Sequence, residues 1–293
     1  MKIRFGVGLG VAAHPDEFTE AVDRLEELGI DSLWLSEVVY DAQVEPFVGM
    51  AYALSRTTRL KVGTGVSILP GRNPVLVAKQ LASLAGLAPG RVLPVFGLHP
   101  ARPRERDLFP VPAGRRGAVF DEALELLRLL LHEDTVTFHG RFYTVEDAGI
   151  APPPAKPLDI WLGGSGPAAL RRVGTLADGW LASFVTPAEA RVKREAILAA
   201  AAAAGREIEA DHFGVSLTVV DGDIPAGFHA LARLRRPDVD PAMLVADGWD
   251  GARRLVEEYI AAGLSKFVIR PAAPVPIGRF LDDLVRVLGP LEN

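Results

Sequence analysis

The sequence predicts an α/β fold, a (β/α)8 TIM barrel with loop insertions that forms a single domain over residues 1–293. Short segments rich in Val, Ile and Leu alternate eight times with longer segments whose apolar residues recur at helical spacing. The chain length of 293 residues also suits one closed barrel. A doubly wound sheet is the alternative, but VGLGVAAHP after the first strand lacks the G-x-G-x-x-G turn common in such sheets.

The first half of the chain supplies four strand–helix pairs. Apolar runs that end at Gly, Pro or charged residues predict strands over residues 3–9, 32–36, 60–68 and 91–96. Apolar stripes, several of them behind a proline, predict helices over residues 16–28, 45–56, 74–84 and 115–132. Pro94 is unusual in the fourth strand, because proline cannot donate to a sheet.

The second half supplies four more pairs and most of the insertions. Strands are expected at residues 159–163, 179–182, 212–220 and 266–270. Helices are expected at residues 166–176, 250–262 and 277–288, and a long alanine-rich helix is expected to follow the 179–182 strand and end at about residue 204. The insertions are expected at residues 100–114, 134–157 and 221–248. VTFHGRFYTV predicts a hairpin over residues 136–145, APPPAKP predicts a stiff return connection, and residues 221–240 are expected to be irregular.

Composition excludes several classes of function. The net charge of −5 does not indicate a nucleic-acid partner, and the absence of cysteine excludes disulfides, thiolate metal sites and iron–sulfur clusters. The six histidines are scattered, so no metal site is predicted. No apolar run approaches membrane length and the start has no signal-peptide layout, so we expect a cytoplasmic protein with a small-molecule substrate.

In a barrel, the active site lies at the carboxyl ends of the strands. The candidates there are Glu37 after the second strand, His99 after the fourth and Arg270 after the eighth, together with residues 65–72 and 163–167. Lys61 and Lys266 begin their strands, so they are expected at the opposite end, which argues against Schiff-base chemistry.

Two glycine-rich stretches allow two interpretations each. Gly63 and Gly65 interrupt the third strand, where glycine marks either a bulge with tight packing or a close approach by a ligand. GGSGP, residues 163–167, is either an anion site at a helix N-terminus or a tight turn with Ser165 as the helix cap. Spacing alone does not separate these alternatives.

Taken together, the motifs resemble the luciferase-like monooxygenase superfamily of flavin- and deazaflavin-dependent barrels. The resemblance rests on IDSLWLSE (30–37), RLKVGTGVSILPGRNPVLVAKQLASL (59–84), FDEALELLRLL (120–130), FHGRFY (138–143), DIWLGGSGPAALRR (159–172) and Asp178–Gly179–Trp180. The details are most similar to actinobacterial members that use the deazaflavin F420, with FMN as the alternative cofactor. The resemblance implies an F420-dependent oxidoreductase that transfers a hydride to or from an organic substrate. The alternatives are an FMN-dependent monooxygenase and a non-catalytic cofactor-binding protein. The resemblance also implies a homodimer.

The resemblance also implies a set of site residues. The expected cofactor-binding residues are Glu37, Gly63, Thr64, Gly65, Val66, Gly97, Gly163, Gly164, Ser165 and Gly166. A cis peptide is expected at Gly65–Val66, with the cofactor ring against Gly65, and the cofactor phosphate is expected on the amides of residues 164–166.

Departures from the family pattern concern the proton chemistry. The family often reads S-E-H after the second strand, whereas this chain has Ser36–Glu37–Val38. We therefore expect two catalytic residues: Glu37 to orient the cofactor edge and His99 to exchange the proton, the alternative for His99 being a loop residue that caps a carbonyl. The polyglutamate tail of F420 is expected near a set of arginines, namely Arg102, Arg104, Arg106, Arg171 and Arg172.

Overall fold

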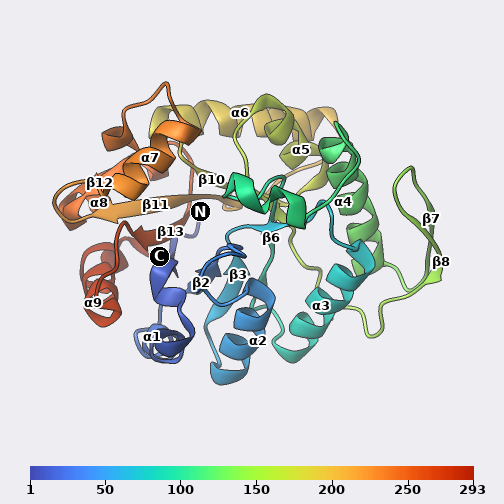
Figure 1. Cartoon of the computed structure of the whole chain (residues 1–293), viewed down its shortest axis with the longest axis horizontal. Helices are drawn as coiled ribbons and strands as arrows, with labels where there is room; N and C mark the ends of the chain where they lie inside the picture. The colour runs from blue at the N-terminus through green and yellow to red at the C-terminus, as the bar shows by residue number, and fades with distance from the viewer.

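A ring of parallel strands occupies the centre of the molecule, and helices cover its outside (Figure 1). The computed structural model describes residues 1–293 apart from the side chains of residues 11 and 12. The strands of the ring are β1 (Arg4–Gly8), β2 (Ser32–Leu35), β3 (Lys61–Thr64), β4 (Ser67–Ile68), β5 (Val92–Leu93), β6 (Val95–Gly97), β9 (Trp161–Leu162), β10 (Gly179–Ser183), β11 (Phe213–Val220) and β13 (Lys266–Pro271).

The third and fourth strands of the ring are each divided in two. The Gly65–Val66 peptide, which is cis as the sequence predicted, separates β3 from β4, and Pro94 separates β5 from β6. β3 pairs with β5 and β4 with β6, β6 then pairs with β9, and β13 pairs with both β11 and β1. The eight strands therefore close into a ring, and the prediction of a (β/α)8 barrel is confirmed.

The helices begin where the sequence places their start signals. They are α1 (Pro15–Glu27), α2 (Pro46–Arg56), α3 (Pro74–Leu87), α4 (Arg116–His132), α5 (Pro167–Leu176), α6 (Pro187–Ala203), α7 (Ala226–Arg235), α8 (Gly248–Ala261) and α9 (Ile277–Leu288). Proline suits the first helical position because its missing N–H would have no partner there. Thr186 and Glu189 form a reciprocal capping box at the start of α6. None of the helices in the described part of the chain has the length and apolar character needed to cross a bilayer.

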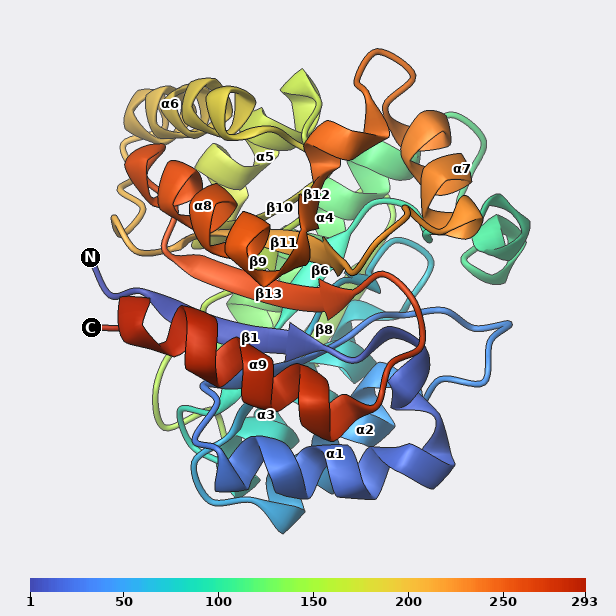
Figure 2. The ribbon, with the colours of Figure 1, turned by 90° about the vertical axis from the view of Figure 1, so that its left-hand side faces the viewer.

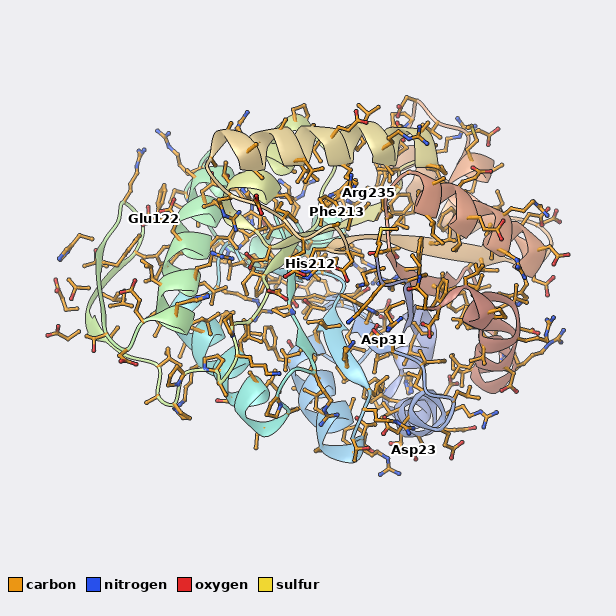
Figure 3. The ribbon with its side chains drawn as sticks, turned by 180° about the vertical axis from the view of Figure 1, so that it is seen from behind. Asp23, Asp31, Glu122, His212, Phe213 and Arg235 are labelled. Carbon is orange, nitrogen blue, oxygen red and sulfur yellow. The ribbon has the colours of Figure 1, made fainter. Side chains whose placement is uncertain are left out.

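The predicted hairpin stands away from the barrel (Figure 1). Its strands are β7 (Val136–His139) and β8 (Thr144–Ala148), and they pair antiparallel. Glu122 on α4 accepts hydrogen bonds from the amides of Phe142 and Tyr143 at 2.7 and 2.8 Å. The carboxylate of Glu122, labelled in Figure 3, therefore fixes the hairpin turn to the helix.

The expectation of irregular structure over residues 221–240 is wrong. That segment contains α7, and it leads through η3 (Pro241–Leu244) into β12 (Val245–Asp247), which pairs in parallel with β11. Ala232 is the buried residue of α7, so the helix carries little of the apolar periodicity from which helices are predicted. Figure 2 shows α7 on the side toward which the arrows of β1 and β13 point.

The inside of the barrel is filled only in part. Trp34, Val95, Trp161, Leu181 and Val268 pack together there, separately from the larger core between strands and helices. The chain ends meet beside β1 (Figure 2), where the Ile3 amide donates to Asn293 Oδ1 at 3.0 Å. The end of the barrel opposite to the chain termini is open and forms the cavity described next.

Candidate active site

A cavity of about 540 Å³, which we call the mouth cavity, opens at the carboxyl ends of the barrel strands. Its volume lies in the range of small-molecule sites. The predicted site residues that line it are Glu37, Gly65, Val66, Gly97, His99, Gly163, Gly164 and Ser165. These residues follow four separate strands, and the closed barrel brings the carboxyl ends of those strands together at the cavity.

Gly63, Thr64 and Gly166 lie outside the lining of this cavity. A Cβ on Gly63 would come within 2.5 Å of the Leu93 carbonyl oxygen, so glycine is needed there for the close approach of β3 and β5. Thr64 Oγ1 donates to the Val95 carbonyl oxygen at 2.7 Å and accepts from the Val95 amide at 2.8 Å. Thr64 therefore links the divided third and fourth strands, which supports the packing interpretation for this part of β3.

Glu37 is buried and holds one wall of the cavity in place. Its Oε2 accepts from the Ile68 amide at 2.6 Å, and Arg72 donates to its Oε1. Burial raises the pKa of Glu37, and the positive charge of Arg72 opposes this effect. Because both carboxylate oxygens are engaged, the structure favours Glu37 as a group that positions residues 66–68 of the cavity wall over a group that transfers protons.

Arg270 extends from the end of β13 across the barrel beneath the cavity. Its Nε donates to Ser216 Oγ at 2.8 Å, its Nη1 to Ser36 Oγ at 2.9 Å, and its Nη2 to the Gly65 carbonyl oxygen at 3.2 Å. Burial lowers the pKa of Arg270 to about 10, so the guanidinium stays charged at neutral pH. No acidic side chain of the described residues forms an ion pair with it, so its charge favours an electron-rich or anionic ligand.

Arg270 gives a structural reason for glycine at position 65. A Cβ on Gly65 would come within 2.8 Å of Arg270 Nη2, and one on Gly8 would come within 2.6 Å of Arg270 Cζ. Glycine at these two positions therefore makes room for the guanidinium. The expectation that a cofactor ring lies against Gly65 stays a prediction.

The turn before α5 has the geometry of an anion site. The N-cap of α5 is Gly166, which makes no side-chain capping hydrogen bond, so the alternative that Ser165 caps this helix is not what the structure shows. Gly164 has a φ of +102°, and its carbonyl oxygen accepts from Trp180 Nε1 at 2.7 Å. The buried indole thus fixes the turn, and the partial positive charge of the helix N-terminus lies at the cavity.

His99 lies at the rim of the cavity, in the connection between β6 and η2 (Pro103–Leu108). Partial burial lowers its pKa, and the positive charges of Arg116, Arg106 and Arg235 lower it further. The imidazole is therefore neutral at pH 7 and can accept a proton. The proton-exchange role of His99 stays a prediction.

The outer wall of the cavity comes from α7, which the sequence did not predict. Phe228 and Leu231 of this helix line the cavity, and the ring of Phe228 stacks on Phe184 with centroids 5.9 Å apart. Pro225 and Pro237 flank the helix. Proline and glycine around a short helix resemble loop punctuation, which explains why these residues were missed.

Three of the arginines expected near a cofactor tail are bonded to the protein itself. Arg102 forms an ion pair with Asp41, Arg104 Nη2 donates to the Tyr40 carbonyl oxygen at 3.2 Å, and Arg172 is buried beside Asp121. These partners reduce the ability of the three arginines to bind another anion.

A second cavity, of about 270 Å³, lies at the opposite end of the barrel, which Figure 3 shows from outside. Lys61 and Lys266 line it, as their positions at the start of strands predicted. Lys61 pairs with Asp31 at 2.7 Å and Lys266 with Asp211 at 3.2 Å. Glu209, Asp211 and His212 converge at this end, away from the mouth cavity.

The fold and the mouth cavity define a ligand-binding α/β barrel with its site at the carboxyl ends of the strands. The model of one family, luciferase-like monooxygenase, matches residues 1–264. The chain therefore belongs to the luciferase-like monooxygenase family, and the resemblance stated from the sequence is confirmed.

Curated relatives include F420-dependent proteins of actinobacteria. The chain is 42% identical over 156 residues to an uncharacterised protein of Mycobacterium tuberculosis, a match that covers 52% of this chain and 54% of the relative. It is 32% identical over 196 residues to the F420-dependent glucose-6-phosphate dehydrogenase of Nakamurella multipartita, covering 61% of this chain and 56% of the relative. The chain thus spans about half the length of the curated relatives it matches.

Solved structures share the fold over the whole chain. An F420-dependent secondary alcohol dehydrogenase in complex with an F420-acetone adduct superposes with a TM-score of 0.83 at 21% identity, covering 100% of both chains. A type II Baeyer-Villiger monooxygenase of Pseudomonas putida in complex with FMN gives a TM-score of 0.76 at 16% identity, covering 100% of this chain and 99% of the other. At these identities the likeness concerns the fold alone.

Proposed function

We propose that the protein is an F420-dependent oxidoreductase that transfers a hydride between the deazaflavin and a small organic substrate. The observation that carries the proposal is the pairing, in one cavity, of the uncapped N-terminus of α5 with the buried cation of Arg270. The first is suited to a phosphate and the second to an electron-rich ring. The curated F420-dependent relatives support the choice of cofactor.

The residues of the cavity fit the parts of this cofactor. Gly164, Ser165 and Gly166 would hold the phosphate through their amides, since glycine permits close approach of the backbone. Residues 65–68, which Glu37 and Arg72 hold in place, would form the wall for the ring. Bound F420 would supply two-electron hydride chemistry, which side chains alone cannot provide.

The chain's own contribution to the reaction is binding, orientation and proton exchange. Arg270 presents a fixed positive charge below the cavity, where no reorganisation is needed when negative charge develops. His99 is the titratable group at the rim that is neutral at pH 7, and it would accept or return the proton of the substrate. Phe184 and Phe228 would exclude water from the outer side of the cavity.

An FMN-dependent monooxygenase is the second candidate. The phosphate turn would serve FMN as well as F420, and a structure of the same fold contains FMN. Turnover separates the two. Purified protein with F420 and a panel of secondary alcohols, aldehydes and sugar phosphates, kept free of oxygen, should change the visible absorbance of F420 with at least one substrate. Turnover only with reduced FMN and oxygen would favour the monooxygenase, and turnover with neither would favour a non-catalytic cofactor-binding protein.

Two further expectations are part of this proposal. The homodimer stays a prediction, which light scattering of the purified protein checks directly. The cytoplasmic location also stays a prediction, which fractionation of the source cells checks.

A further inference from the structure

Three arginines lie close enough to His99 for their charges to act on it. They are Arg106 on η2, Arg116 in the first turn of α4 and Arg235 in the last turn of α7, and His99 follows β6. His99 and Arg235 line the cavity itself. We call these four residues the rim cluster.

The charges of the rim cluster act on one another. Burial lowers the pKa of Arg116 and of Arg235, and the charge of Arg106 lowers both further. The same three arginines lower the pKa of His99. Like charges held this close destabilise one another, and a bound anion would relieve that repulsion.

The arginines of the rim cluster also have bonding capacity to spare. Arg116 Nη2 donates to the Phe109 carbonyl oxygen at 2.7 Å, but its Nη1 is buried without a hydrogen-bond partner. Arg235 Nη2 donates to the Ala101 carbonyl oxygen at 2.9 Å. Neutral carbonyls thus anchor both guanidinium groups and leave their charge uncompensated. A buried donor without a partner is costly, so Nη1 of Arg116 is available to an acceptor from a ligand.

Neighbouring arginines show the usual alternative. Arg236, next in sequence to Arg235, pairs with Glu189 at 2.6 Å and with Asp238 at 2.9 Å, and Arg102 pairs with Asp41. Among the described side chains, none of the three arginines of the rim cluster has an ion-pair partner. The buried Glu105 lies on the same short helix as Arg106; its Oε1 accepts from the Tyr40 amide, its Oε2 has no hydrogen-bond partner, and it forms no ion pair with the rim cluster.

We propose that the rim cluster binds an oxyanion group of the substrate, a carboxylate or a phosphate, so that the substrate is a small organic anion. This inference rests on the proposed function, because it takes the mouth cavity to be the catalytic site. Arginine is suited to the role, since its planar fork binds two oxygens of such a group at once. An anionic group bound here would place the rest of the substrate beside His99, where the proton is exchanged.

The glutamate tail of F420 carries the same carboxylate chemistry and is the other possible source of the anion. The place of His99 in both the cavity lining and the rim cluster favours the substrate, because a tail bound here would occupy the space next to the proton-exchanging group. The experiment must therefore distinguish a free anion from the tail.

The first measurement uses inorganic phosphate as the probe. The imidazole proton resonances of His99, assigned by their loss in His99→Asn, are followed by NMR during a phosphate titration at constant ionic strength. We expect a saturable shift and a rise in the pKa of His99. Arg116→Gln and Arg235→Gln should each weaken phosphate binding roughly tenfold, as expected for one lost charge-assisted hydrogen bond. The matched control is Arg104→Gln, on the same short helix as Arg106, which should stay within about twofold of the parent protein.

The second measurement titrates the protein with F420 bearing several glutamates and with F420 lacking them, each with and without phosphate. Equal affinity of the two forms, unaffected by phosphate, supports the substrate assignment. Tighter binding of the glutamylated form that phosphate reverses would assign the rim cluster to the tail and overturn the proposal. A shift of His99 that does not saturate, or that is equally weakened in Arg104→Gln, would also overturn it. Phosphate binding at the cluster without binding of either form of F420 would instead contradict the proposed function.

Discussion

Replacing Gly164 by alanine should weaken cofactor binding as well as the fold. Gly164 has a φ of +102°, a backbone conformation that side chains with a Cβ rarely adopt. An added Cβ would also lie 3.0 Å from the Cβ of Ala169, closer than ordinary contact. The turn is further fixed by the hydrogen bond from Trp180 to the Gly164 carbonyl oxygen, so it cannot relax freely.

The expected size of the effect follows from these contacts. Holding alanine at this φ costs about 1–3 kcal/mol. Relaxation by rotation of the peptide would break the bond to the buried Trp180 indole, at a cost of about 1–3 kcal/mol. The free energy of unfolding should therefore fall by about 2 kcal/mol on either route. A rotated peptide would also remove one amide from the phosphate, which corresponds to roughly 10- to 100-fold weaker binding.

The assay is F420 binding by fluorescence titration, combined with urea unfolding of the protein without cofactor. Gly205→Ala is the matched control, because Gly205 has a φ of +68° at the end of α6, with nothing within 4 Å of an added Cβ. It should lose stability but retain cofactor affinity. If Gly164→Ala behaved like this control, with affinity unchanged, the assignment of the phosphate to residues 164–166 would be refuted.

Three further variants test other parts of the site. His99→Asn should lower turnover while F420 affinity stays constant. Since the pKa of His99 is lowered, the activity of the parent protein should be fully developed at pH 7 and fall only below about pH 6.5. Turnover that changes neither with this substitution nor with pH would remove the role of His99. Glu37→Ala should destabilise the fold by about 3 kcal/mol, because the Ile68 amide loses its buried acceptor and the pair with Arg72 is broken. Glu37→Gln should destabilise it much less. Equal urea midpoints of the two variants would contradict this. Trp180→Phe should loosen the Gly164 turn. It should therefore weaken the binding of F420 more than tenfold beyond any loss for a flavin analogue without phosphate. Equal losses for the two ligands would argue against phosphate binding at this turn.

The parts of the fold that the sequence predicted are those determined by local chemistry. Pro74 predicted the start of α3, and the structure adds that the side chain of the preceding Asn73 accepts from the Val75 amide. Pro94 was unusual for a strand, and the structure shows that it divides the fourth strand of the ring. The closure of the barrel followed from counting strand–helix pairs, since connection handedness leaves few alternatives.

The parts that were missed depend on contacts between distant residues. The guanidinium of Arg270 crosses the barrel to Ser36 and to the Gly65 carbonyl oxygen, over 200 residues earlier in the chain, and periodicity carries no information about such a reach. The sequence therefore did not indicate that Arg270 is a neighbour of Gly65. The role of α7 was missed because a helix that buries little shows no clear apolar stripe.

The binding preference of the purified protein between F420 and FMN tests the central claim most directly. Equilibrium titration of each cofactor, oxidised and reduced, followed by absorbance and fluorescence, would measure the four affinities under identical conditions. Arg270, Gly164 and Ser165 line one cavity, so we expect saturable binding of F420 that Gly164→Ala weakens. Binding of FMN at least tenfold tighter than that of F420, or F420 binding indifferent to Gly164→Ala, would contradict the account.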